Sequence, residues 1–95
     1  MAVGVVIEFK GATLEQYDQV IEKMGFTPGG RGGAGGMFHW VTATDDGIRV
    51  TDVWQSQEQF QKFAEEQIGP YTREVGFPNP PQITFHEVHN HLTAG

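Results

Sequence analysis

The feature that most constrains the fold is the pair Asp46-Gly47, flanked on both sides by residues with high strand propensity within positions 37–56. Two such segments joined at Asp-Gly predict a β-hairpin, because a two-residue hairpin loop uses the positive φ angles that these residues tolerate. With Asp46-Gly47 as the loop, His39 is expected opposite Trp54 and diagonal to Asp52.

Both faces of this hairpin carry large side chains. Side chains alternate between the two faces along a strand, so every second residue shares a face. One face carries His39, Asp52 and Trp54, and the other carries Phe38, Trp40 and Val53. The first of these sets combines an imidazole, a carboxylate and an indole, which makes it the first place to look for chemistry.

The segments around the hairpin alternate between strand-like and helix-like patterns. A near-continuous apolar run predicts a strand at 2–9, and a last strand is expected at 82–91. Apolar residues spaced three and four apart predict a helix over 14–24 and another after Ser56, each opened by a capping sequence. Gly69-Pro70 predicts a break and a short further helix, because proline lacks a backbone donor and clashes with the preceding turn.

The resulting order is β-α-β-β-α-β, which predicts a single α+β domain over residues 1–95 with a ferredoxin-like, four-stranded antiparallel sheet. Two helices cover only one face of such a sheet. Because both faces of the hairpin are rich in apolar groups, the uncovered face is expected to be an association surface. We therefore expect a homodimer in which two sheets pack together as a dimeric α/β barrel. Residues 92–95 are expected to be a loose tail.

The composition disfavours several classes of partner. Six basic and twelve acidic residues give a formal net charge of -6, whereas nucleic acids and anionic membranes attract a positive surface. The apolar runs are far shorter than the roughly 18 residues that a membrane span requires. Cysteine is absent, so thiolate chemistry and disulfides are excluded, and a cytoplasmic protein is expected.

The segment 53–63, VWQSQEQFQKF, ends a strand with Val-Trp and begins a capped helix with two phenylalanines. In this segment and in its element order the chain resembles the dimeric α/β-barrel superfamily, and above all its antibiotic-biosynthesis-monooxygenase-like proteins. The resemblance implies a homodimer that acts as a cofactor-free oxygenase, cyclase or isomerase on a small aromatic or polyketide-type ligand. Haem degradation, known from another branch, is disfavoured. Glu8 stands where that branch has asparagine, and no histidine lies between Gln55 and Pro81.

His39, Asp52 and Trp54 are the candidate residues that the hairpin groups most firmly. A carboxylate beside an imidazole orients the ring, which prepares a histidine for proton transfer. In this interpretation His39 is a base or hydrogen-bond donor, Asp52 orients it, and Trp54 packs against the ligand. The alternative is a structural histidine that only satisfies a buried carboxylate.

Further candidates depend on which side chains share a face across strands. His86 is a catalytic candidate because it neighbours Phe85 on the last strand and can face the same pocket. Glu8 is a carboxylate in an otherwise apolar strand, so it requires a partner such as Arg49 or Lys10, or a polar pocket. The candidate ligand-binding residues are Trp54, Glu8, Phe60, Phe63 and Tyr71.

His89 and His91 share a face of the expected last strand, together with Glu87. Three such side chains can hold a metal ion, but their spacing matches no established zinc signature. We therefore expect no metal and no cofactor, and metal or haem binding ranks below the other functions.

The connection at 27–36 contains six glycines. It follows a helix and precedes a strand, whereas phosphate-binding glycine loops follow a strand and open a helix. A mobile connection that can act as a lid is expected. Two functions remain open, because fold alone does not decide between them: an enzyme for an aromatic ligand, and a non-catalytic ligand-binding or stress-response dimer.

Overall fold

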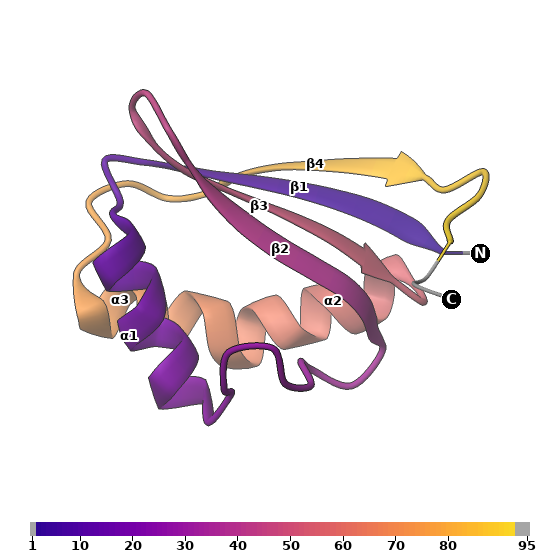
Figure 1. Ribbon diagram of the computed structural model, residues 1–95, viewed down its shortest axis with the longest axis horizontal. Coiled ribbons are helices and arrows are strands. Elements are labelled where there is room, and N and C mark those ends of the chain that lie inside the picture. The colour runs from indigo at the N-terminus through magenta and orange to yellow at the C-terminus, as the bar shows by residue number, and fades with distance from the viewer. Residues whose placement is uncertain (1, 93–95) are drawn as a thin grey trace.

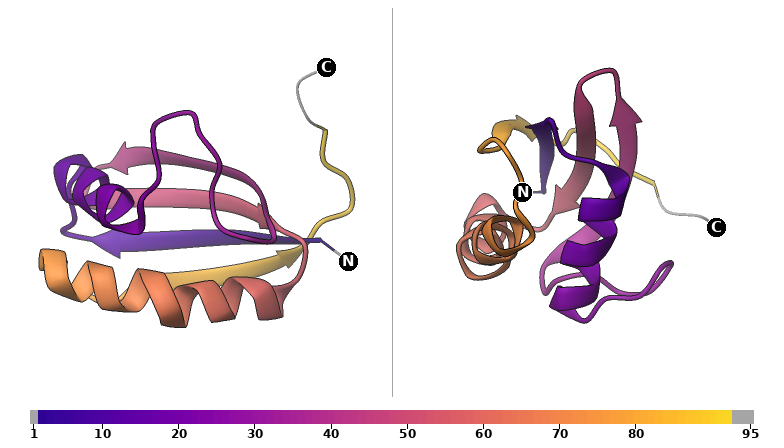
Figure 2. Two further views of the ribbon diagram at one scale, coloured as in Figure 1. Left: turned by 90° about the horizontal axis from the view of Figure 1, so that it is seen from below. Right: turned by 90° about the vertical axis from the view of Figure 1, so that its left-hand side faces the viewer.

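A computed structural model of the 95-residue chain describes residues 2–92. Its elements in chain order are β1 (Val3–Lys10), α1 (Leu14–Met24), β2 (Gly36–Thr44), β3 (Gly47–Trp54), α2 (Gln57–Phe63), the π-helical segment η1 (Ala64–Ile68), α3 (Gly69–Val75) and β4 (Gln82–Glu87). The strands form a four-stranded antiparallel sheet in the order β2-β3-β1-β4, with the helices on one face (Figure 1 and Figure 2). The predicted α+β, ferredoxin-like fold is confirmed. The tail expected at 92–95 lies, beyond Leu92, outside the described residues.

The core is built on β1, which pairs with β3 on one side and β4 on the other. Its alternate residues Val3, Val5, Ile7 and Phe9 face the helices and are at most 8% exposed. They form a common cluster with buried residues of β3 and with Phe60 of α2. The strand is therefore held from three directions, and the neighbouring β3 provides a rigid base for side chains on the helical face.

The hairpin forms as predicted, but the predicted register is wrong by two positions. Its loop is Asp45-Asp46, and His39 therefore pairs with Asp52 instead of Trp54. Because side chains alternate with a period of two, this shift leaves residues 38–42 and 50–54 on their predicted faces; the pairing is irregular only between Gly36 and Phe38. His39, Asp52 and Trp54 therefore share one face in the observed register, as they do in the predicted one.

Glycine is needed at position 47 for a reason other than the positive φ angle that the Asp-Gly pattern suggests. No non-glycine residue among 2–92 has a positive φ angle, and Gly47 does not have one either. A Cβ atom at Gly47 would instead lie 2.1 Å from the backbone oxygen of Phe9. Glycine is required there because β1 and the start of β3 approach too closely for a side chain.

The predicted helix caps are present. The Thr13 hydroxyl accepts from the Gln16 N–H while the Gln16 side chain accepts from the Thr13 N–H, and α1 ends at Gly25 with a φ of 83°. The Ser56 hydroxyl accepts from the Gln59 N–H at the start of α2 in the same way. These local hydrogen bonds fix where each helix begins.

The break predicted at Gly69-Pro70 is wrong, although the short further helix, α3, is confirmed. Helical structure continues from Gln57 to Val75 (Figure 1). The widened turn of η1 lies just before the proline, and the Gly69 N–H donates to the Ala64 carbonyl five residues earlier. A π-helical turn changes the backbone spacing that makes proline clash with a regular α-helix, so the chain coils through Pro70 without a gap.

The face of the sheet away from the helices carries aromatic surface. On β2, the edge strand, Phe38 is 55% exposed and Trp40 is 48% exposed. Val6 and Val53 lie on the same face and are half-buried. The helices all lie on the other side (Figure 2). None of the helices within residues 2–92 combines the length and the apolar character that a membrane span demands.

Candidate active site

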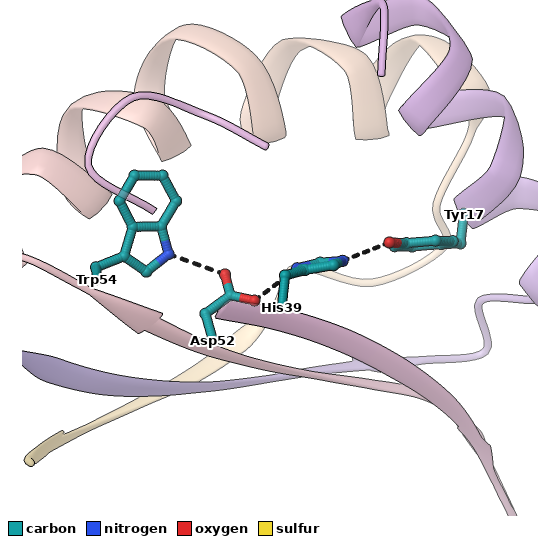
Figure 3. Close-up of polar contacts among 4 residues, drawn as sticks. All are labelled: Tyr17, His39, Asp52 and Trp54. Carbon is teal, nitrogen blue, oxygen red and sulfur yellow. Dashed lines mark hydrogen bonds and ion pairs between the residues drawn. The ribbon is translucent and has the colours of Figure 1, made fainter. Parts of the chain in front are cut away.

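A buried carboxylate, Asp52, is at the centre of the candidate site. Only 5% of its surface is exposed, and it faces the helices from β3. Burying a carboxylate costs several kcal/mol unless hydrogen bonds satisfy it. Nδ1 of His39 lies 2.6 Å from Asp52 Oδ1, and the Trp54 indole N–H donates to Oδ2 over 3.0 Å (Figure 3). Both carboxylate oxygens therefore have a donor.

Strand geometry explains why these three residues meet. Asp52 and Trp54 are two residues apart on β3 and share a face, while His39 is the cross-strand partner of Asp52. β3 is an interior strand, but His39 lies on the edge strand β2 and its side chain is 42% exposed. The site is anchored in the core and opens to solvent at the edge of the sheet.

Tyr17 of α1 is a fourth member of the site. Its hydroxyl is hydrogen-bonded to Nε2 of His39, and the two rings are nearly parallel, with centroids 5.9 Å apart and an interplanar angle of 12° (Figure 3). The sequence places Tyr17 only in the apolar stripe of a helix. The signal that could have identified it is the phenolic hydroxyl, which needs a partner when tyrosine points toward a core.

The hydrogen bonds of the site all donate toward Asp52. An ionised Asp52 can only accept, so Nδ1 of His39 carries a proton, and Nε2 of the neutral ring is then an acceptor for the Tyr17 hydroxyl. Burial, followed by the negative charges of Asp52 and Asp18, raises the pKa of Tyr17 to about 12. The phenol therefore keeps its proton at neutral pH. The result is a continuous chain of hydrogen bonds from Tyr17 through His39 to Asp52, with Trp54 as a second donor.

Trp54 is enclosed by aromatic and glycine neighbours. It is 3% exposed, with ring centroids 5.7 Å from Phe60 and 5.2 Å from Phe63. A Cβ atom at Gly33 would lie 2.7 Å from the Phe63 ring and 3.2 Å from the Trp54 ring. The glycine-rich connection is therefore packed against the indole at this point. The expected mobility of this connection stays a prediction.

A groove of about 450 Å³ adjoins this enclosure. It lies between the end of α1, the glycine-rich connection and the α2–η1 segment, and its lining includes Met24, Phe26, Gly33, Gln59, Lys62 and Phe63. Phe26 and Phe63 stack with their centroids 6.2 Å apart. Because Phe63 and Gly33 also contact Trp54, they form the wall between the groove and the site.

Two predicted site residues lie on the opposite face of the sheet. Glu8 accepts a hydrogen bond from Arg49 Nε over 2.7 Å, so one of its anticipated partners is the observed one. His86 is exposed, and the expectation that it faces the same pocket as Phe85 is wrong, because adjacent strand residues point to opposite faces. Phe85 instead packs edge-on against Phe60 in the core, with centroids 5.7 Å apart. Within one chain, neither Glu8 nor His86 shares a site with His39.

The remaining candidates are divided between core and groove. Phe60 is 1% exposed and belongs to the core, whereas Phe63 reaches the groove. Tyr71 is half-buried on α3. The hydrogen bonds that join Tyr17, His39, Asp52 and Trp54 do not include it.

The last strand is shorter than the sequence suggests. β4 ends at Glu87, which pairs with Val3 at the start of β1, so no neighbouring strand remains to extend the pairing to His89 and His91. The predicted strand to residue 91 is therefore wrong. In the part of the chain from 2 to 92, no group of three or more His, Asp or Glu side chains is arranged to hold a metal ion.

The sequence matches no protein-family model and no curated protein. Solved structures share the fold. A monooxygenase from the gene ActVA-Orf6 of Streptomyces coelicolor, in complex with nanaomycin D, is 19% identical with a TM-score of 0.57, over 99% of this chain and 92% of that one. A variant of SnoaB, a cofactor-independent oxygenase from Streptomyces nogalater, is 14% identical with a TM-score of 0.61, over 98% of each chain. A conserved protein from Methanosarcina mazei Go1 is 12% identical with a TM-score of 0.58, over 90% of this chain and 91% of that one.

These likenesses establish the fold. They confirm, at the level of fold, the resemblance to antibiotic-biosynthesis-monooxygenase-like proteins that segment 53–63 indicates. Function has to be argued from the site, since related folds host unrelated activities. The class of protein is therefore a ferredoxin-like α+β chain whose sheet presents a hydrogen-bonded Tyr-His-Asp-Trp group beneath its helices.

Proposed function

We propose that this protein is a homodimeric, cofactor-free oxygenase, cyclase or isomerase that acts on a small, flat aromatic ligand of polyketide type. The observation that supports the proposal is the buried Asp52 carboxylate, which holds His39 through Nδ1 and directs its second nitrogen toward α1. The activities named for two proteins with this fold, a monooxygenase and a cofactor-independent oxygenase, agree with it.

In this proposal each residue of the hydrogen-bonded group has a role. His39 is the general base or hydrogen-bond donor at a ligand oxygen, and Asp52 orients the ring and stabilises the imidazolium that forms. General acid–base catalysis by a positioned side chain contributes roughly 10²- to 10⁴-fold to a rate. Trp54 provides a flat surface for the ligand, and its hydrogen bond to Asp52 fixes the orientation of the indole.

Access to Trp54 requires movement of the wall that covers it. Gly33 and Phe63 close the indole off from the adjoining groove. The groove's volume of about 450 Å³ falls within the range of small-molecule sites. We infer that a ligand enters from the groove and that the glycine-rich connection moves aside, which is the lid role that its composition suggests.

Ligand binding is tested by thermal shift with nanaomycin D, hydroxynaphthalenes and hydroxyanthraquinones as probes. A ligand at one hundred times its dissociation constant adds roughly 2.7 kcal/mol to the free energy of unfolding. We expect this protection to be lost in His39→Ala and in Trp54→Ala. It should persist in His86→Ala, because His86 is exposed on the opposite face. Oxygen uptake and product analysis on the ligands that bind then test turnover. No binding, or binding that ignores the first two substitutions, contradicts the proposal.

The homodimer is proposed from the aromatic face of the sheet. A second copy of the chain covers Phe38 and Trp40, since the helices of the same chain lie on the other side. Sedimentation at micromolar concentration should give about twice the chain mass of 10.5 kDa. Trp40→Glu should dissociate the dimer, because it would bury an unpaired charge. Leu14→Glu is the matched control: Leu14 is similarly exposed at 43% but lies on α1. A monomeric wild type refutes the dimer.

A non-catalytic ligand-binding or stress-response dimer is the second candidate. It is favoured by the complete internal pairing of the site: within residues 2–92 no buried side-chain nitrogen or oxygen lacks a hydrogen-bond partner. Nε2 of His39 in particular is already paired with Tyr17. Ligands that bind at Trp54 without oxygen uptake or a change in the ligand would select this candidate.

A further inference from the structure

Tyr17 links two layers of the fold. It lies on α1, 22 residues before His39 in the chain, and its half-buried phenol reaches down to the imidazole on β2. The near-parallel rings place the hydroxyl against Nε2. This hydrogen bond connects the helical layer to the buried carboxylate of the sheet (Figure 3).

When Nδ1 of the neutral His39 ring donates to Asp52, Nε2 is the basic nitrogen of the group of four. The indole N–H of Trp54 only donates, and both oxygens of Asp52 already accept hydrogen bonds. The phenol of Tyr17 keeps its proton, since burial and the charges of Asp52 and Asp18 raise its pKa to about 12. Any basic function of the group therefore resides at Nε2, and this nitrogen is hydrogen-bonded to the Tyr17 hydroxyl.

We propose that Tyr17 is a positioning residue that fixes the His39 ring, in the tautomer set by Asp52, and covers its basic nitrogen in the ligand-free protein. The phenol and the carboxylate are hydrogen-bonded to the two different nitrogens of the imidazole, so the ring is fixed in orientation. A ligand oxygen that binds His39 has to replace the Tyr17 hydroxyl at Nε2. As a part of catalysis this role rests on the proposed function, whereas the control of the ring's orientation and accessibility does not.

The tautomer is tested by ¹⁵N NMR of the imidazole nitrogens. On the neutral ring of the wild-type protein, Nδ1 of His39 should carry the proton and Nε2 should show the signature of a nitrogen that accepts a hydrogen bond. Tyr17→Phe keeps the aromatic ring and removes only the hydroxyl, so the Nε2 signal should move toward that of an unbonded nitrogen. Tyr71→Phe, which removes the hydroxyl of the other tyrosine of the chain, should leave both signals unchanged.

The covering of Nε2 is tested by chemical modification. Diethyl pyrocarbonate acylates an unprotonated, accessible imidazole nitrogen, and peptide mapping by mass spectrometry reports each histidine separately. Tyr17→Phe should raise the rate at His39 about fivefold to tenfold, the factor expected when one hydrogen bond no longer has to break first. The rate at His89, which is exposed beyond the end of β4, is the internal reference and should not change.

Both measurements use the ligand-free protein, so they are independent of whether any ligand or turnover is found. Failure of the ligand screen would remove the proposed function and leave the role of Tyr17 in place. A wild-type His39 with its neutral-ring proton on Nε2 overturns the role of Tyr17 even if Tyr17→Phe does not fold. Signals and rates that are the same in wild type and in folded Tyr17→Phe overturn it as well.

Discussion

Replacing Asp52 by asparagine should destabilise the fold by about 2–3 kcal/mol, through hydrogen bonds to a charged acceptor. The carboxylate accepts from His39 over 2.6 Å and from Trp54 over 3.0 Å. The amide keeps one acceptor oxygen and turns an NH₂ group toward the other donor. Hydrogen bonds to charged groups contribute about 1.5–3 kcal/mol each, and an unpaired buried donor costs about 1–3 kcal/mol. His39 is half-exposed, so water can replace part of the hydrogen bond that it loses. The expected destabilisation therefore lies near the lower end of what these two contributions give together.

Urea unfolding followed by far-ultraviolet circular dichroism measures this change, at one fixed protein concentration because a dimer couples stability to concentration. The expected loss corresponds to a fall of roughly 10–20 °C in the melting temperature of a domain this size. Asp45→Asn is the matched control: Asp45 is exposed in the hairpin loop, and its substitution should change stability by less than about 0.5 kcal/mol.

A double-mutant cycle separates the hydrogen bond from a general effect of the substitution. Once Trp54→Phe has removed the indole donor, Asp52→Asn should cost less than it does in the wild-type protein. Equal costs in the two backgrounds would contradict a direct bond between the carboxylate and the indole. A loss no larger than that of Asp45→Asn would refute the reasoning as a whole.

Three further changes test separate parts of the structure. The pKa of Tyr17 is raised from 10.0 to about 12, so the unfolded chain loses this proton first and stability should fall as pH rises through that window. An ultraviolet titration follows the ionisation of the tyrosines, and Tyr17→Phe should remove the step at high pH. If the substitution instead removes a step near pH 10, the raised pKa of Tyr17 is contradicted. Gly47→Ala should cost about 1–3 kcal/mol in urea unfolding, because its Cβ would overlap the Phe9 oxygen, whereas Gly32→Ala has open space and should be nearly neutral. Glu8→Gln should cost at most about 1 kcal/mol, since its ion pair with Arg49 is largely exposed; a larger loss would mean that the pair is more buried than the structure shows.

The elements of the fold were predictable because their signals are local. Capping residues such as Thr13 and Ser56 satisfy backbone donors three residues away, and helical and strand periods repeat within a few residues. The order of these elements then leaves few topologies, of which the ferredoxin-like one is observed. His39, Asp52 and Trp54 could be grouped for the same reason. A period of two assigns them to one face in either register.

What only the tertiary structure decided depends on contacts between distant parts of the chain. The hairpin loop is Asp45-Asp46 because β3 begins against the end of β1, where the close approach of Gly47 to Phe9 is not visible in any local pattern. The direction of His86 likewise follows from its pairing with β1. The contact of Tyr17 with His39 depends on where α1 lies over the edge of the sheet. The packing of whole elements sets that position, so the sequence identifies the imidazole and its carboxylate, and the folded chain alone brings the phenol to them.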